Sequence, residues 1–225
     1  MVLLVSLVPF YLFLPELAAR REPFAPELAL DRLFPVVPGW ALVYGALYLF
    51  LIFLPVLTVR DEEHIRRTVF AYLSVWITSY LVFVACPTIA PRPPEVVGAG
   101  FGAWALRGLY DADPPYNCFP SLHVAHSFVS ALTCRRLHRG VGASALVAAS
   151  LVALSTLFTK QHYLVDVAAG LGLALLASLG FLRTYPRERV PALDRRTAPL
   201  LALSLFALTL TAVGGLWVFY RWRVG

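Results

Sequence analysis

Residues 141–182 read VGASALVAASLVALSTLFTKQHYLVDVAAGLGLALLASLGFL, two long apolar segments separated by the short polar sequence TKQH. A helix that crosses a bilayer needs about 20 predominantly apolar residues, and the segments 141–158 and 163–182 both come close to that length. The sequence therefore predicts two transmembrane helices that meet at a polar connection.

The rest of the chain has the same character, with further apolar stretches at 2–18, 40–59, 69–86, 121–134 and 198–219. Hydrophobic residues make up 59% and charged residues 14% of the 225 positions, and the mean hydropathy is +0.72. Soluble proteins have about 45–50% apolar and about 25% charged residues, so a water-soluble globule is excluded. Disorder and a disulfide scaffold are excluded too, the latter by only three cysteines.

We expect an all-α fold, a polytopic transmembrane helical bundle in which residues 1–225 form a single integral membrane domain. Six helices would form the catalytic core, and 198–219 would be an additional seventh span. The stretch 2–18 is interpreted as a span, because no basic residue precedes it and no small-residue cleavage site ends it.

The connection 87–120 holds seven of the seventeen prolines, so we expect it to be non-helical. If seven spans alternate from an inner N-terminus, eleven arginines fall on the inner side and eight basic residues on the other. The positive-inside rule then places 87–120 and 159–162 together on the extracytoplasmic side. Cys86 and Cys118 bracket the longer connection and either form a disulfide there or are separate small apolar residues.

Ionisable side chains are rare in the apolar stretches, and those present cluster at this side. His123 and His126 open the stretch 121–134, and His162 and Asp166 open the stretch 163–182. Ionisable groups at membrane depth are costly and are by default functional candidates. The four-residue spacing of His162 and Asp166 predicts one helix face, where the carboxylate orients the imidazole and leaves its other nitrogen as nucleophile or base.

Two cations and a helix start adjoin these histidines. Arg92 lies in the sequence APRPP, whose prolines restrict the backbone, and Lys160 is the chain's single lysine. Ser121 begins a predicted helix whose free amides and hydroxyl can bind an anion. This set suits a phosphate ester, and the net charge of +6 suits lipid headgroups without a nucleic-acid partner. His64 and His138, among arginines on the opposite side, are expected to be solvated.

Three quoted motifs in this order, Arg92-Pro93, Pro120-Ser121-Leu122-His123, and Ser155 with His162 and Asp166, resemble the signature of the type 2 phosphatidic acid phosphatase superfamily. The resemblance covers the region 80–182, which would carry the catalytic motifs. It implies a helical, metal-independent membrane phosphatase or phosphotransferase without a cofactor.

The resemblance also implies the roles of individual residues. His162 would attack phosphorus and become a phosphohistidine, Asp166 would orient it, and His123 would act as general acid and then base. Arg92, Lys160 and Ser121 would bind the phosphate of the lipid phosphate or phosphodiester.

The sequences FPSLH at 119–123 and TKQHY at 159–163 are most similar to the inositolphosphotransferase-like branch, which contains inositol phosphorylceramide synthases. Ala85 and Thr156 stand where the superfamily usually has a lysine and an arginine, and these departures favour the same branch. The acceptor stays open between water, which makes a phosphatase, and inositol or another alcohol, which makes a head-group transferase.

Two other classes compete with this interpretation. His123, His126, His162 and Asp166 could instead bind a metal ion in a membrane hydrolase. They could also relay protons in a transporter, although polar groups at span ends on one side fit that class less well.

Overall fold

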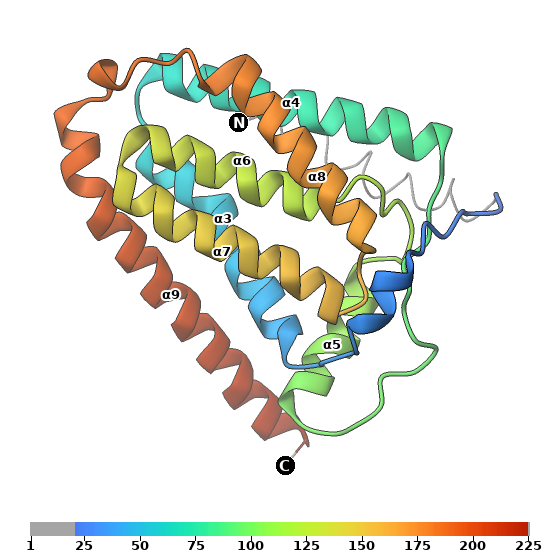
Figure 1. The fold of residues 1–225 in the computed structure, drawn as a ribbon. Coiled ribbons are helices and arrows are strands. Elements are labelled where there is room, and N and C mark those ends of the chain that lie inside the picture. Colours follow the sequence, from blue (N-terminus) through green and yellow to red (C-terminus); the bar gives the residue numbers. More distant parts are fainter. Residues whose placement is uncertain (1–20, 225) are drawn as a thin grey trace.

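The computed structural model describes residues 21–224, which form an all-helical bundle with no strand beyond two isolated β-bridges (Figure 1). The helices are α3 (Trp40–Thr58), α4 (Glu62–Ala85), α5 (Phe101–Ala112), α6 (Leu122–Leu137), α7 (Arg139–Phe158), α8 (Leu164–Ala177) and α9 (Ala192–Val224). A π-helical turn, Ser178–Leu182, extends α8. The predicted all-α membrane bundle is confirmed.

Five of these helices are long and apolar enough to cross a membrane, namely α3, α4, α7, α8 with its extension, and α9. The protein is therefore an integral membrane protein. The predicted stretch 121–134 corresponds to α6, which has 16 residues and a length of about 24 Å. The predicted span 2–18 lies outside the described residues.

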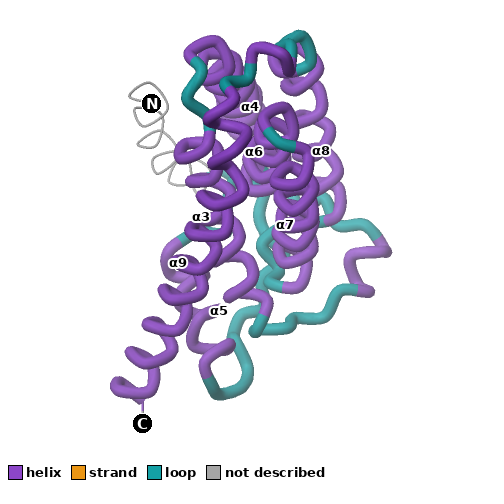
Figure 2. The backbone as a smooth tube through the Cα atoms, turned by 90° about the vertical axis from the view of Figure 1, so that its left-hand side faces the viewer, coloured by secondary structure: helices purple, strands orange, loops and turns teal. Residues whose placement is uncertain are grey.

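Helix α6 lies at the centre of the bundle, where α3, α4, α7 and α8 all contact it (Figures 1 and 2). One apolar cluster joins it to α3, α7 and α9, and a second joins it to α4 and α8. A Cβ at Gly142 would lie 2.3 Å from the Arg135 Cα, so this glycine allows α7 to pack closely on the end of α6. The central helix is thus placed by contacts on all sides.

The long helices alternate in direction, which brings the connections 86–121 and 159–163 to the same end of the bundle (Figure 1). Helix α9 runs along the outside and buries only Asp194, Ala198 and Leu205 among its side chains. Its exposed leucines need no protein partner, because lipid tails are as apolar as leucine.

The structure corrects two expectations from the sequence and decides between two alternatives that the sequence left open for Cys86 and Cys118. The connection 87–120 contains α5, because its prolines lie before residue 95 and after residue 113 and leave the interval free to form a helix. No disulfide joins Cys86 to Cys118: Cys86 is exposed, whereas Cys118 is buried with its thiol 3.5 Å from the Pro115 carbonyl. His64 is buried rather than solvated, and its ring stacks on Tyr185 with centroids 4.4 Å apart.

Candidate active site

The N-terminus of α6 is fixed by the start of α8. Ser121 is the N-cap of α6, and its hydroxyl accepts a hydrogen bond from the Val124 amide at 3.3 Å. The Ser121 amide donates to the backbone carbonyl of Asp166 at 3.1 Å. Gly170 permits this approach, because a Cβ there would lie 2.5 Å from the Ser121 carbonyl oxygen. The two helix starts are therefore joined through their backbones.

The connection between α7 and α8 turns back on the end of α7. The Thr156 carbonyl accepts hydrogen bonds from the amides of Gln161 at 2.9 Å and His162 at 3.3 Å. Lys160, with φ of +52°, takes the left-handed conformation in this turn. His162 consequently lies in the turn before α8, so the predicted shared helix face with Asp166 is wrong, although the two side chains still meet.

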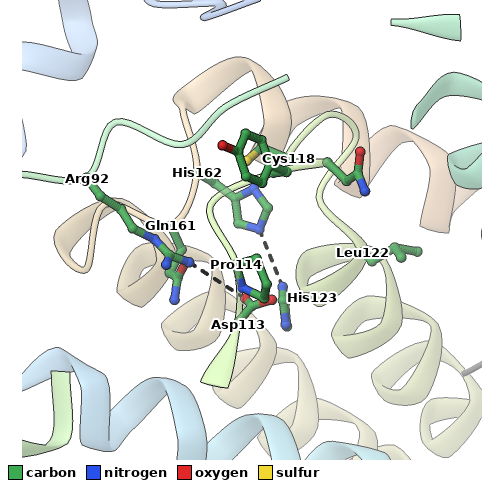
Figure 3. A pocket seen from close by; sticks show the side chains of 10 residues that line it. Arg92, Asp113, Pro114, Cys118, Leu122, His123, Gln161 and His162 are labelled. Carbon is green, nitrogen blue, oxygen red and sulfur yellow. Dashed lines mark hydrogen bonds and ion pairs between the residues drawn. The ribbon is translucent and has the colours of Figure 1, made fainter. Parts of the chain in front are cut away.

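Two histidines face each other at this end of the bundle. The His123 Nδ1 is 3.4 Å from the His162 Nε2 (Figure 3), and the His162 Nδ1 is 3.5 Å from the Asp166 Oδ2. The Asp166 carboxylate is fully buried, and its Oδ2 also accepts from the Tyr163 amide at 2.9 Å. The tautomers that fit these contacts direct the His162 Nδ1 proton to Asp166 and leave a lone pair on Nε2.

Arg92 reaches the same place from the proline-rich connection, and only 10% of its side chain is exposed. Its Nη2 donates to the Gln161 side-chain oxygen, and its Nη1 donates to the Tyr110 carbonyl at 3.2 Å. The guanidinium lies over the Tyr110 ring at 4.5 Å, and the Asp113 carboxylate is 4.0 Å from Nη2 (Figure 3). The cation is thus held by α5, by the residue after α5 and by the turn that carries His162.

Helix α5 supports this turn directly, because the Tyr110 hydroxyl donates to the Thr159 carbonyl at 2.7 Å. Burial raises the pKa of Tyr110 to about 12 against the lowering effect of Arg92, so its phenol stays protonated at neutral pH. Burial also raises the pKa of the Cys118 thiol well above its ordinary value, and the nearby Asp166 carboxylate raises it further. The thiol therefore adds no negative charge to the site.

A pocket lies between the two histidines, Arg92 and the connection before α6 (Figure 3). It is lined by Arg92, Asp113, Pro114, Tyr116, Asn117, Cys118, Leu122, His123, Gln161 and His162. Several buried polar atoms here make no hydrogen bond within the described residues: the Arg92 Nε, both amide atoms of Asn117, and the Gln161 Nε2. Each unsatisfied buried polar group costs about 1–3 kcal/mol. The pocket is therefore suited to a polar ligand that supplies these missing hydrogen bonds.

The six predicted site residues occupy different places around the pocket. Arg92, His123 and His162 line it, and Asp166 lies next to His162. Two others have structural contacts instead: the Ser121 hydroxyl caps α6, and the Lys160 ammonium donates to the Asp31 carbonyl at 3.1 Å and is outside the pocket lining.

His126 faces away from His162, toward α3 and α4. The Trp76 indole donates to the His126 Nε2, and the Tyr48 hydroxyl lies 3.2 Å from the Nδ1. The four ligands of the alternative metal site are therefore not brought to one point. Within residues 21–224, no group of three or more His, Cys, Asp or Glu side chains is placed to hold a metal ion.

The sequence analysis did not name three charged or amide residues of the pocket lining as site residues: Asp113, Asn117 and Gln161. Gln161 directly precedes His162 in the sequence TKQH, so its position beside a predicted site residue could have indicated it. Asp113 and Asn117 belong to the long connection and enter the pocket only through the fold of that connection, which spacing along the chain does not reveal.

The chain is similar to a known protein family over more than half of its length. Residues 36–180 match the PAP2 superfamily. A PA-phosphatase related-family protein of Dictyostelium discoideum is 24% identical over 130 residues, which cover 52% of this chain and 23% of that protein. This chain therefore corresponds to less than a quarter of the length of that relative. No solved structure matches the chain.

Proposed function

The chain belongs to the PAP2 superfamily, and we propose that it is a membrane-embedded phosphotransfer enzyme acting on a lipid phosphate or phosphodiester. The observation that carries this proposal is the row of Asp166, His162 and His123, with separations of 3.5 and 3.4 Å, beside the buried guanidinium of Arg92. Such a row supplies an oriented nucleophile, a proton donor and a cation in one pocket.

In the first step, the His162 Nε2 attacks phosphorus, and the bond from phosphorus to the lipid oxygen breaks. His123 enters this step as an imidazolium, protonated on both ring nitrogens. The departing oxygen takes the proton of its Nδ1 and leaves His123 neutral, while Asp166 stabilises the imidazolium formed at His162. In the second step, His123 takes a proton from the acceptor hydroxyl, whose oxygen attacks phosphorus and breaks the N–P bond. Both histidines return to their starting protonation states.

Charge on the phosphoryl oxygens would be stabilised by Arg92 and by the uncharged amide donors of Gln161 and Asn117. Of the predicted binding residues, we assign Arg92 to the phosphate, because its guanidinium lines the pocket. We assign Ser121 to the start of α6 and Lys160 to the turn before His162, where each has a structural hydrogen bond. The proposed steps use no metal ion and no cofactor.

Two finer aspects belong to the same proposal. Water as acceptor makes the enzyme a phosphatase, whereas inositol or another alcohol makes it a head-group transferase. The distribution of eleven arginines against eight basic residues supports an extracytoplasmic position of the pocket.

The purified full chain, incubated with a panel of lipid phosphates and phosphodiesters with and without inositol, tests the proposal. We expect diacylglycerol or another dephosphorylated lipid to form with at least one substrate, together with the phosphorylated acceptor. With water this is free phosphate from a monoester or a head-group phosphate from a diester, and with inositol it is a phosphorylated inositol. His162→Ala is the control. Product formation that is equal in the folded His162→Ala protein, or absent with every lipid, would refute the proposal.

A further inference from the structure

The pocket contains unusually little positive charge for a phosphate site. Arg92 is the one arginine or lysine in its lining, and the carboxylate of Asp113 lies 4.0 Å from that guanidinium. With His162 neutral and His123 protonated, as the proposed first step requires, the lining has a formal charge of +1. The Lys160 ammonium, which could have raised this charge, is directed to the Asp31 carbonyl instead.

Two kinds of lipid phosphate differ in the charge they bring to this pocket. A phosphate monoester has a second pKa near about 6 and carries nearly two negative charges at pH 8, whereas a phosphodiester carries one at any such pH. A net lining charge of +1 balances a single negative charge. A second negative charge would face Asp113 at the edge of the pocket and the buried Asp166 behind His162.

The remaining polar groups of the pocket are uncharged. Asn117 and Gln161 offer amide groups with buried atoms that lack partners, and burial keeps the Cys118 thiol protonated. Amides donate hydrogen bonds to phosphate oxygens without adding charge. They suit a phosphate whose single charge is already balanced by the net charge of the lining.

We propose that Asp113 makes the pocket selective for the charge of the substrate phosphate. The pocket then selects singly charged phosphodiesters over doubly charged phosphate monoesters. This inference rests on the proposed function and specifies its substrate class. Asp113 acts here through repulsion of the second negative charge, in addition to its contact with Arg92.

Phosphatidic acid and phosphatidylmethanol test this inference, because they differ only in a methyl group that removes one phosphate charge. Both yield diacylglycerol when the phosphorus–lipid oxygen bond breaks, so one measurement serves both. At pH 8, we expect wild-type kcat/KM to favour phosphatidylmethanol by about tenfold, since the second negative charge of phosphatidic acid is repelled by the carboxylates at the site. Asp113→Asn should remove most of this preference by increasing kcat/KM for phosphatidic acid.

Asp111→Asn is the matched control, because Asp111 is exposed near the end of α5, two residues before Asp113, and does not line the pocket. It makes the same change in net charge and should leave the preference unaltered. If Asp113→Asn does not fold, the wild-type protein still gives a test between pH 5 and 8. Its relative use of phosphatidic acid should fall with rising pH, and enzyme titration cancels in the ratio of the two substrates.

The outcomes are distinguishable. A wild-type preference for phosphatidic acid at pH 8 would overturn the charge selection and leave the proposed function standing. An equal fall in both activities in Asp113→Asn would also overturn it, because that result describes a residue that only positions Arg92. Failure of both lipids, and of every other lipid in the panel, would refute the proposed function itself.

Discussion

The close approach of α8 to the start of α6 makes Gly170→Ala a sharp test of the site geometry. The added Cβ would lie 2.5 Å from the Ser121 carbonyl oxygen and 3.3 Å from the Ser121 carbonyl carbon and Cβ. Ordinary carbon–oxygen contacts begin near about 3.3 Å, so the two backbones must separate by about 0.8 Å. Because Ser121 is the N-cap of α6, this movement shifts His123 relative to His162.

Two effects of Gly170→Ala can be measured separately. Overpacking typically costs about 1–3 kcal/mol, against which alanine gains up to about 1 kcal/mol in helix propensity. A misplacement of about 1 Å can lower the rate about a hundredfold, so we expect kcat to fall by roughly ten- to a hundredfold. Thermal unfolding in detergent reports the first effect, and diacylglycerol release under substrate saturation reports the second.

Gly172→Ala is the matched control, because its Cβ would meet nothing within 4 Å although it lies on the same helix. It should keep the wild-type rate and be as stable as the wild type or slightly more so. Equal behaviour of the two variants, with wild-type rate and stability in both, would refute the close packing of Gly170 on Ser121.

The remaining predictions concern the nucleophile, metal dependence and topology. His162→Ala should lower turnover by at least about a hundredfold and Asp166→Asn by less, since an orienting partner is easier to bypass than a nucleophile; steady-state rates of the folded variants check this. Activity should persist in excess chelator, because the pocket supplies its own guanidinium; complete loss restored by Zn²⁺ would favour the metal hydrolase. For topology, the exposed Cys86 is first replaced by serine, which leaves two buried cysteines. A single cysteine at Val97 should then react with an impermeant maleimide on intact cells, and one at Glu188 should not. The reverse pattern would place the pocket in the cytoplasm.

Much of the fold could be predicted because its signal is local. An apolar segment of span length has few alternatives, and the start of α6 at Ser121 follows from a capping residue directly after a proline. Helix α5 was missed because the proline count of the whole connection hid the proline-free interval within it. A finer reading of positions 95–113 would have allowed a helix there.

The residues of the proposed catalytic row, Asp166, His162 and His123, could be predicted from the sequence for a similar reason. Buried ionisable residues are rare in membrane spans, so His123, His162 and Asp166 stand out against an apolar background. Arg92 was found because prolines surround it. The role of Lys160 could not be read in the same way, because its side-chain direction depends on a left-handed backbone conformation and on a carbonyl 129 residues away along the chain.

The contacts that set the chemistry are mostly made by the backbone, which the sequence does not specify. The Ser121 amide bonds to the Asp166 carbonyl, and the Thr156 carbonyl holds the turn of Gln161 and His162. Nearly every residue has a backbone amide and carbonyl, so residue type does not predict these contacts. The sequence does encode the residue that allows α8 to lie so close to the start of α6. Gly170 leaves room for the Ser121 carbonyl oxygen, which a single methyl group would displace. The distance between the two histidines therefore depends on a residue that carries no chemistry of its own.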